Sequence, residues 1–302
     1  MPQNPETSKP ILGGQAVVEG IMIRGARSVT IAVKNPNDSI LVKSEELNNF
    51  FAGRLRSIPL IRGVIVLAET LVLGLRALTW SSAVAIGDIE QEDQEAGLTI
   101  LDWVIFALAF GTGLAVFFAG PVVATSWLEN FFADWVAVLC EGVLRILFLL
   151  VYIWLIGHIS DVERMFQFHG AEHMAIAAAE TRTPLTNENV RNFSRLHPRC
   201  GTSFLLTVAL VSVVVFAFAG SDPLWWRMLS RLLLIPAVAG VAYEGIRLAD
   251  KFQGFFLVKL ISSGNLNLQK LTTRVPDDEH IDLAIVAVSR AQAFEDTISD
   301  SR

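Results

Sequence analysis

The residues best suited to chemistry lie between positions 166 and 174, which read FQFHGAEHM. His169 and His173 are four residues apart, and Glu172 directly precedes the second histidine. On a helix this spacing places both imidazoles on one face, with Glu172 at its border. The order His-x-x-Glu-His is that of inverted zincins, in which two histidines bind zinc and the glutamate activates water. The spacing predicts a divalent-metal site, with zinc favoured and Glu172 as the catalytic base.

Further metal donors occur in the same part of the chain. Four of the five histidines fall within residues 158–202, and HPRCG adds a thiol close to one of them. A catalytic zinc keeps three protein ligands and one open position, whereas a structural zinc is closed by four. The third ligand of a catalytic site, or the remaining two of a structural site, would come from this set. Without a metal, the same histidines would hydrogen-bond at helix ends. The candidate additional donors are His197, Cys200 and, more distantly, Glu244.

A glycine-rich stretch, GGQAVVEGIMIRG, spans residues 13–25. Its glycines suggest tight turns or close backbone contacts. It lacks the Gly-Lys-Ser/Thr ending of a phosphate-binding loop. Glu19 and Arg24 are candidate site residues, although an ion pair that fixes a loop is the more common use of such a pair.

The composition indicates a membrane protein. Of the 302 residues 52% are hydrophobic and 18% charged, and the mean hydropathy is +0.49. Soluble domains average about 25% charged residues. The net charge of −6 argues against nucleic-acid binding, and the two cysteines suit a reducing cytoplasm rather than a disulfide framework. The polar, proline-containing residues 1–10 resemble a disordered tail and not a secretory leader.

Hydropathy predicts a mainly α, polytopic membrane protein with about four transmembrane helices. Each of four apolar segments approaches the roughly 20 residues that a helical span needs. A further segment, residues 58–87, is interrupted at seven-residue intervals by charged residues that share one face, which favours an amphipathic interfacial helix. Its charged residues are Arg62, Glu69 and Arg76, and the four expected spans are residues 100–127, 135–157, 203–220 and 226–243.

Charge placement predicts the orientation. Five arginines lie within residues 158–202, and the positive-inside rule favours a cytoplasmic position for that loop. Four spans then leave both termini in the cytoplasm. Within the second span, Glu141 and Arg145 are expected to pair, whereas Arg227 and Arg231 are expected to snorkel toward the headgroups.

The remaining regions are expected outside the bilayer. Alternating residues around a Pro-Asn-Asp turn predict a β-hairpin of residues 28–33 with 39–43. Residues 253–273 have an apolar stripe suited to the membrane surface, and residues 277–296 predict a soluble amphipathic helix. The expected domains are a tail (1–10), an N-terminal cytoplasmic region (11–57), the interfacial helix (58–87), the membrane domain (100–243) and a C-terminal cytoplasmic region (244–302).

Five stretches occur together in a familiar order. GGQAVVEGIMIRG, FHGAEH, HPRCGTSF, YEGIRLAD and LQKLTTRVPDDEHIDLAIVAV resemble the YqhQ-like family of bacterial membrane proteins, domain of unknown function 1385. The family has been described as predicted metal-dependent enzymes, so the resemblance implies membrane embedding and a metal-dependent activity. Met174 stands where the family commonly has lysine. The resemblance implies that the motif residues are Glu19, Arg24, His169, Glu172, His173, His197, Arg199, Cys200, Glu244 and Arg247.

Two functions follow as hypotheses. The first is a metal-dependent hydrolase at the cytoplasmic membrane face that acts on a peptide or a lipid-linked group. The second is a non-enzymatic scaffold or assembly factor for other membrane proteins, in which the His/Cys motifs are structural. Both place the protein in contact with the lipid bilayer and without nucleic acid.

Overall fold

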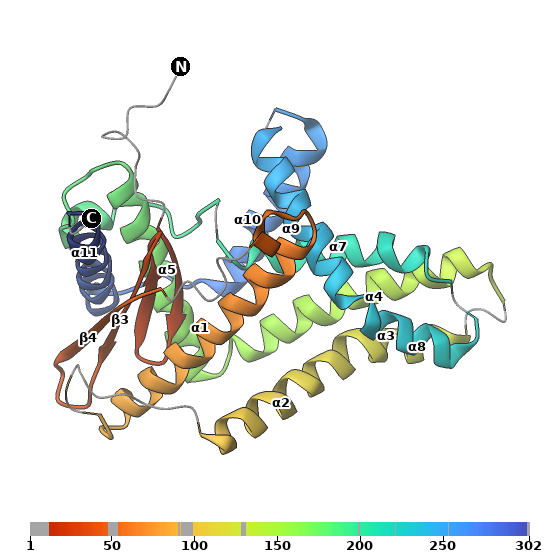
Figure 1. The fold of residues 1–302 in the computed structure, drawn as a ribbon, viewed down its shortest axis with the longest axis horizontal. Coiled ribbons are helices and arrows are strands. Elements are labelled where there is room, and N and C mark those ends of the chain that lie inside the picture. Colours follow the sequence, from red (N-terminus) through yellow and green to blue (C-terminus); the bar gives the residue numbers. More distant parts are fainter. Residues whose placement is uncertain are drawn as a thin grey trace.

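A computed structural model describes residues 12–47, 54–89, 91, 99–127, 131–198, 200–220, 222–252 and 254–300. The chain is mainly helical, with a small antiparallel sheet near the N-terminus. The sheet and two helices form one end of the molecule, and the apolar helices extend away from it (Figure 1). The expected tail, residues 1–10, lies outside the described residues.

The sheet is a four-stranded meander in the order β1-β2-β3-β4. The predicted hairpin is confirmed by β3 and β4, whose turn is closed by the Asn35 side chain as it accepts hydrogen bonds from the backbone of Asn37 and Ser39. The glycine-rich stretch forms two further strands, which the sequence pattern did not predict. The strand bounds are Gly13–Val17 (β1), Gly20–Arg24 (β2), Ser28–Lys34 (β3) and Ile40–Glu46 (β4).

Helices cover both faces of the sheet. The second half of α1 (Ile61–Ala85) packs on one face through Ala77, Trp80 and Val84. The other face is covered by α5 (Ser160–Glu180) and α11 (Asp278–Asp300), which enclose a second apolar core. The predicted C-terminal helix is therefore confirmed, and its apolar stripe is buried against the sheet.

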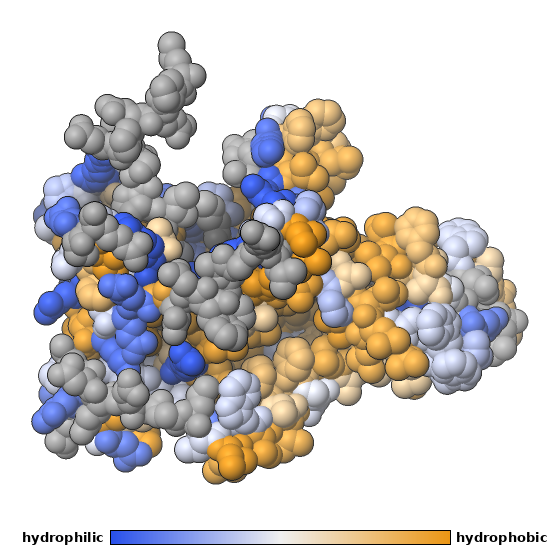
Figure 2. Space-filling view, in the orientation of Figure 1, coloured by the Kyte–Doolittle hydropathy of each residue, from blue (hydrophilic) through white to orange (hydrophobic). Residues whose placement is uncertain are grey.

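The apolar helices differ in length from the four expected spans. Two described stretches, Ile100–Thr125 and Trp135–Ile156, are long and apolar enough to cross a membrane. The first consists of α2 (Ile100–Leu114), a π-helical turn, η4 (Ala115–Ala119), and α3 (Gly120–Thr125), whereas the second belongs to the continuous α4 (Asp134–Ile156). Figure 2 shows hydrophobic side chains over this part of the molecule and hydrophilic ones near the sheet.

The third and fourth expected spans are less regular. The third is α7 (Ser203–Ala217), whose 15 helical residues are fewer than a span usually needs. The fourth is split into α8 (Leu224–Leu233) and α9 (Ile235–Lys251), and the bend of 50° makes it either a broken span or a re-entrant segment. The described residues thus contain two helices that are long and apolar enough to cross a membrane, or three if the bent pair is one span. The short elements η3 (Arg54–Ser57) and α6 (Asn187–Val190) and the amphipathic α10 (Phe256–Thr272) complete the fold.

Charged residues inside the helical part form one cluster. The expected pair is confirmed, since Arg145 Nη2 lies 2.7 Å from Glu141 Oε1. The expectation that Arg227 and Arg231 snorkel is wrong, because both are completely buried. Their guanidinium groups contact Glu141 at 3.1 Å, and a buried carboxylate needs such partners.

Candidate metal centre

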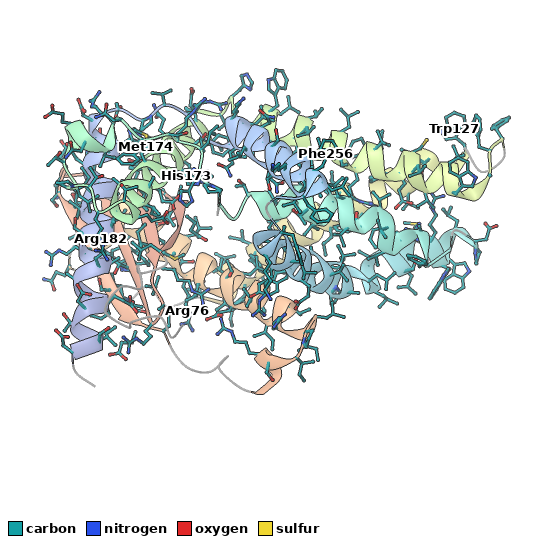
Figure 3. The ribbon with its side chains drawn as sticks, turned by 90° about the horizontal axis from the view of Figure 1, so that it is seen from above. Arg76, Trp127, His173, Met174, Arg182 and Phe256 are labelled. Carbon is teal, nitrogen blue, oxygen red and sulfur yellow. The ribbon has the colours of Figure 1, made fainter. Side chains whose placement is uncertain are left out.

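Helix α5 carries the His-x-x-Glu-His sequence where the sheet layer meets the apolar helices. It follows α4 after a turn at 157–159, and Asp161 and Glu163 in its first turn complement the helix dipole. Figure 3 shows His173 and Met174 near the end of the molecule that holds the sheet, and Trp127 at the opposite end. His169, Glu172, His173 and Met174 are all buried, and Met174 belongs to the apolar core against the sheet.

Each candidate histidine is held by a backbone carbonyl. The Nδ1 of His169 donates to the Thr272 carbonyl oxygen at 2.8 Å, and the Nδ1 of His173 donates to that of Arg195 at 2.6 Å. Because a carbonyl only accepts, each Nδ1 carries the proton and a neutral ring presents a lone pair at Nε2. Metal-binding histidines usually have this second hydrogen bond, which fixes the tautomer and the ring orientation.

The two histidines lie close to one thiol. The Cys200 sulfur lies 3.2 Å from His169 Nε2, and one donor atom from each of His169, His173 and Cys200 lies within 4.8 Å of the other two. The imidazole rings of His169 and His173 are 4.4 Å apart between centroids. The structure therefore brings together three of the four residues that the sequence proposed as ligands.

Glu172 lies at the border of this cluster and beneath strand β1. Its Oε2 is 3.6 Å from His173 Nε2, and it has no hydrogen-bond partner among the described residues. A side chain on Gly14 would place its Cβ 2.5 Å from Glu172 Oε1, so only glycine lets β1 pass this closely. An unpartnered carboxylate in such a position is costly unless it is protonated or faces a cation.

Burial changes the proton affinities of these groups. Loss of solvation raises the pKa of Glu172 to about 8, which favours the neutral acid near pH 7. Burial, with a smaller repulsion from His169, lowers the pKa of His173 to about 3, and burial also lowers the pKa of His169. Both imidazoles are therefore neutral at pH 7, as metal ligation requires.

His197 lies beside the cluster rather than in it. Its ring centroid is 5.7 Å from that of His173, and its Nε2 is 3.4 Å from a carboxylate oxygen of Glu180. Gln269 holds its backbone from both sides, since the amide side chain donates to the His197 carbonyl and accepts from its N–H. His197 thus helps to position the segment that carries Arg195 and Cys200.

Three of the other motif residues, Glu19, Arg24 and Glu244, lie in ion pairs between elements. Glu19 and Arg24 do not pair with each other: Glu19 contacts Arg164 on α5 at 2.6 Å, and Arg24 contacts Glu69 on α1 at 2.9 Å. Glu244 on α9 pairs with Arg62 on α1. Arg247 is exposed on α9, and Arg199 lies outside the described residues.

Sequence reasoning missed the groups that hold the two histidines. Gly170 allows the segment after α10 to approach α5, because a Cβ there would lie 2.4 Å from the Arg274 carbonyl oxygen. The available signal was the glycine between His169 and Glu172, since a helix-interior glycine often marks a close backbone contact. The carbonyls of Thr272 and Arg195 have no sequence signal, because any residue supplies one.

Comparisons with known proteins identify a family and assign it no chemistry. Residues 58–293 match the family described as "Protein of unknown function (DUF1385)". The chain is 35% identical over 297 residues to "Uncharacterized protein YqhQ" of Bacillus subtilis (strain 168). The aligned region covers 95% of this chain and 93% of that protein. No solved structure matches the chain.

Proposed function

The chain belongs to the DUF1385 family, and we propose that it is a membrane-associated, zinc-dependent hydrolase whose centre is formed by His169, His173 and Cys200. One observation carries this proposal. Each imidazole donates an Nδ1–H hydrogen bond to a backbone carbonyl, which leaves both Nε2 lone pairs available to a metal, and His169 Nε2 lies 3.2 Å from the Cys200 sulfur. A set of two imidazoles and one thiolate suits zinc and leaves a fourth position open.

We propose that Glu172 acts as the general acid–base residue. A bound zinc ion acts as a Lewis acid, which polarises a carbonyl group and ionises water near neutral pH. Glu172 Oε2 lies next to the His173 Nε2 atom and has no competing partner among the described residues. Glu172 must be ionised to accept a proton from water. Burial alone raises its pKa to about 8, and a cation held by the neighbouring His173 would lower this pKa toward the working pH.

We propose that this centre lies close to a membrane surface. Two to three of them are long and apolar enough to cross a bilayer, and α5 follows directly after one of them. We propose four membrane segments, with α7 and the bent α8–α9 pair as the shorter ones, and both termini in the cytoplasm. The arginines of residues 158–202 support this orientation. A C-terminal green-fluorescent-protein fusion should fluoresce, and a dark, exported fusion would contradict the orientation.

A second candidate is a structural metal in a scaffold for other membrane proteins. Deep burial of His173 and Glu172 favours it, since a closed site has no need of substrate access. In that case the Glu172 carboxylate would be the fourth ligand and would hold α5 to the segments around residues 195–200 and 272–274. Removing the metal would then loosen the fold rather than stop a reaction.

Metal content and a Glu172→Gln variant separate these possibilities. Wild-type protein purified in detergent without chelator should contain about one zinc per chain by mass spectrometry, and His169→Ala/His173→Ala should contain none. Glu172→Gln should keep the zinc and the melting temperature if Glu172 is a base. A loss of both would favour the structural metal. Metal-free, well-folded wild type would contradict any metal centre.

A further inference from the structure

Strand β1 forms an edge of the sheet, and its backbone groups alternate in direction. The Lys34 N–H on β3 donates to the Glu19 carbonyl at 2.9 Å. Because every second residue of an antiparallel strand faces the same neighbour, the backbone groups of Ile21 and Ile23 on β2 also bond to β3. The intervening residues of β2 therefore bond to β1, where their register partners are Gly13, Gln15 and Val17. The N–H and C=O groups of Gly14 and Ala16 consequently point away from the sheet.

These outward groups have no partner inside the described part of the chain. No hydrogen bond joins the backbone of Gly14 or Ala16 to another described residue. Gly13 is exposed, and no atom lies within 4 Å of the position that a Cβ there would take. An unpaired strand edge is a ready template for another extended chain.

The same edge adjoins the candidate centre. Gly14 packs directly on the Glu172 side chain, and Glu172 Oε2 lies 3.6 Å from His173 Nε2. Ala16 packs on the apolar core beneath β1, which holds the strand against α5. The outward amides of β1 therefore run beside the residue that we assign to proton transfer.

We propose that an extended polypeptide segment binds along β1 as a fifth strand and presents one of its peptide bonds to the centre. This inference rests on the proposed function and names its substrate class. Alternating N–H and C=O groups recognise a peptide backbone, whereas an acyl chain or a glycan has no matching pattern. In the reaction the oxygen of water bonds to the peptide carbonyl carbon, the C–N bond breaks, and the proton that Glu172 takes from the water passes to the leaving amine.

Backbone N-methylation of a peptide probe tests the pairing. The probe is a fluorescein-labelled peptide of eight alternating threonine and valine residues with lysine at both ends, and the protein is full-length Glu172→Gln in detergent. Pairing along an edge uses every second N–H of the added strand. N-methylation of the residues whose N–H groups face β1 should therefore weaken binding at least tenfold. N-methylation of the intervening residues, whose N–H groups face away from β1, should have little effect. No binding, or equal effects of the two sets, would overturn the proposal.

Two variants of β1 provide a matched pair for the same titration. Ala16→Pro removes an outward N–H and leaves the bonds to β2 in place, so binding should weaken at least tenfold. Gly13→Ala retains its N–H and meets no neighbouring atom, so binding should be unchanged. Equal binding by both variants would overturn the proposal.

The metal-free His169→Ala/His173→Ala protein distinguishes this inference from the proposed function. The edge does not depend on the metal, so the peptide should still bind. A zinc-loaded wild type whose Glu172→Gln form binds no peptide would overturn the edge proposal alone. Binding that appears only after removal of residues 1–11 would also overturn it, since this chain would then be the occupant of the edge.

Discussion

At the scale of single residues, Gly170 decides how closely two segments approach. An added Cβ would lie 2.4 Å from the Arg274 carbonyl oxygen, so Gly170→Ala must push away the segment that gives His169 its Thr272 acceptor. Overpacking of this kind costs about 1–3 kcal/mol. We expect Gly170→Ala to lower the free energy of unfolding and to reduce zinc content, measured by thermal unfolding in detergent and by mass spectrometry.

Gly113→Ala is the matched control, because no atom lies within 4 Å of its Cβ position and α2 should gain roughly 0.5–1 kcal/mol. Equal behaviour of the two variants would show that the close approach is unimportant.

The sequence predicted the local part of the site and not the long-range part. His169, Glu172 and His173 follow from helical spacing alone, because residues four apart share a face. That Cys200 joins them while His197 turns toward Glu180 depends on the path of the loop, which residue types do not determine. The contact of Gly14 with Glu172 joins positions 158 residues apart in the sequence, and one sequence holds no signal for it.

At the scale of elements, an ion-pair network joins the sheet to α5 and α11, the two helices that cover one of its faces. Glu279 on α11 accepts from Lys34 on β3 at 3.0 Å and from Arg164 on α5 at 2.7 Å, and Arg164 also pairs with Glu19 in the β1–β2 turn. Lys34, and then Arg164, lower the pKa of Glu279 below its ordinary value of 4.5. A lowered carboxyl pKa stabilises the fold above the unfolded-state value, and this stabilisation is lost as the pH falls through the folded-state value.

Glu279→Gln should therefore lower stability at pH 7, and its difference from wild type should shrink as the pH falls below 4.5. The Glu279 side chain is 39% exposed, so solvent screening limits the effect to under about 1 kcal/mol. Melting temperatures between pH 7 and pH 3 measure it. Glu188→Gln, an exposed carboxylate on α6 with no ion pair among the described residues, should follow the wild-type curve. A constant difference for Glu279→Gln across this range would exclude the electrostatic cause.

The sequence predicted strands β3 and β4 but not β1 and β2, and the difference has a physical reason. Strands β3 and β4 surround a recognisable turn, whereas β2 is buried on both faces and reads IMI without alternation. A short apolar run without alternation does not distinguish a strand from a buried helical segment. The turn before it is also unusual, since Glu19 has a φ of 50°, a conformation that side-chain-bearing residues seldom adopt.

At the scale of the whole molecule, the Glu141 cluster holds the irregular apolar helices together. Glu141 on α4 contacts Arg145 on its own helix and both arginines of α8, and Arg145 reaches Ser212 on α7 at 3.1 Å. Hydropathy located α4 and α8 but treated their charges as independent, and therefore placed Arg227 and Arg231 in the headgroups. The cluster instead draws α8 into the bundle, where it bends against α9 after ten residues.

Glu141→Leu should therefore destabilise the helical part more than any substitution on its exposed apolar surface. The change removes the common carboxylate of three buried guanidinium groups, and breaking a buried ion pair on one side costs about 3–5 kcal/mol. Val143→Ala is the matched control on the same helix, because Val143 is 67% exposed in a position suited to lipid. The temperature at which each detergent-solubilised variant loses its monodisperse elution peak measures the difference. A Glu141→Leu protein as stable as Val143→Ala would contradict this prediction. It would mean that apolar packing alone holds α7 and α8 in place.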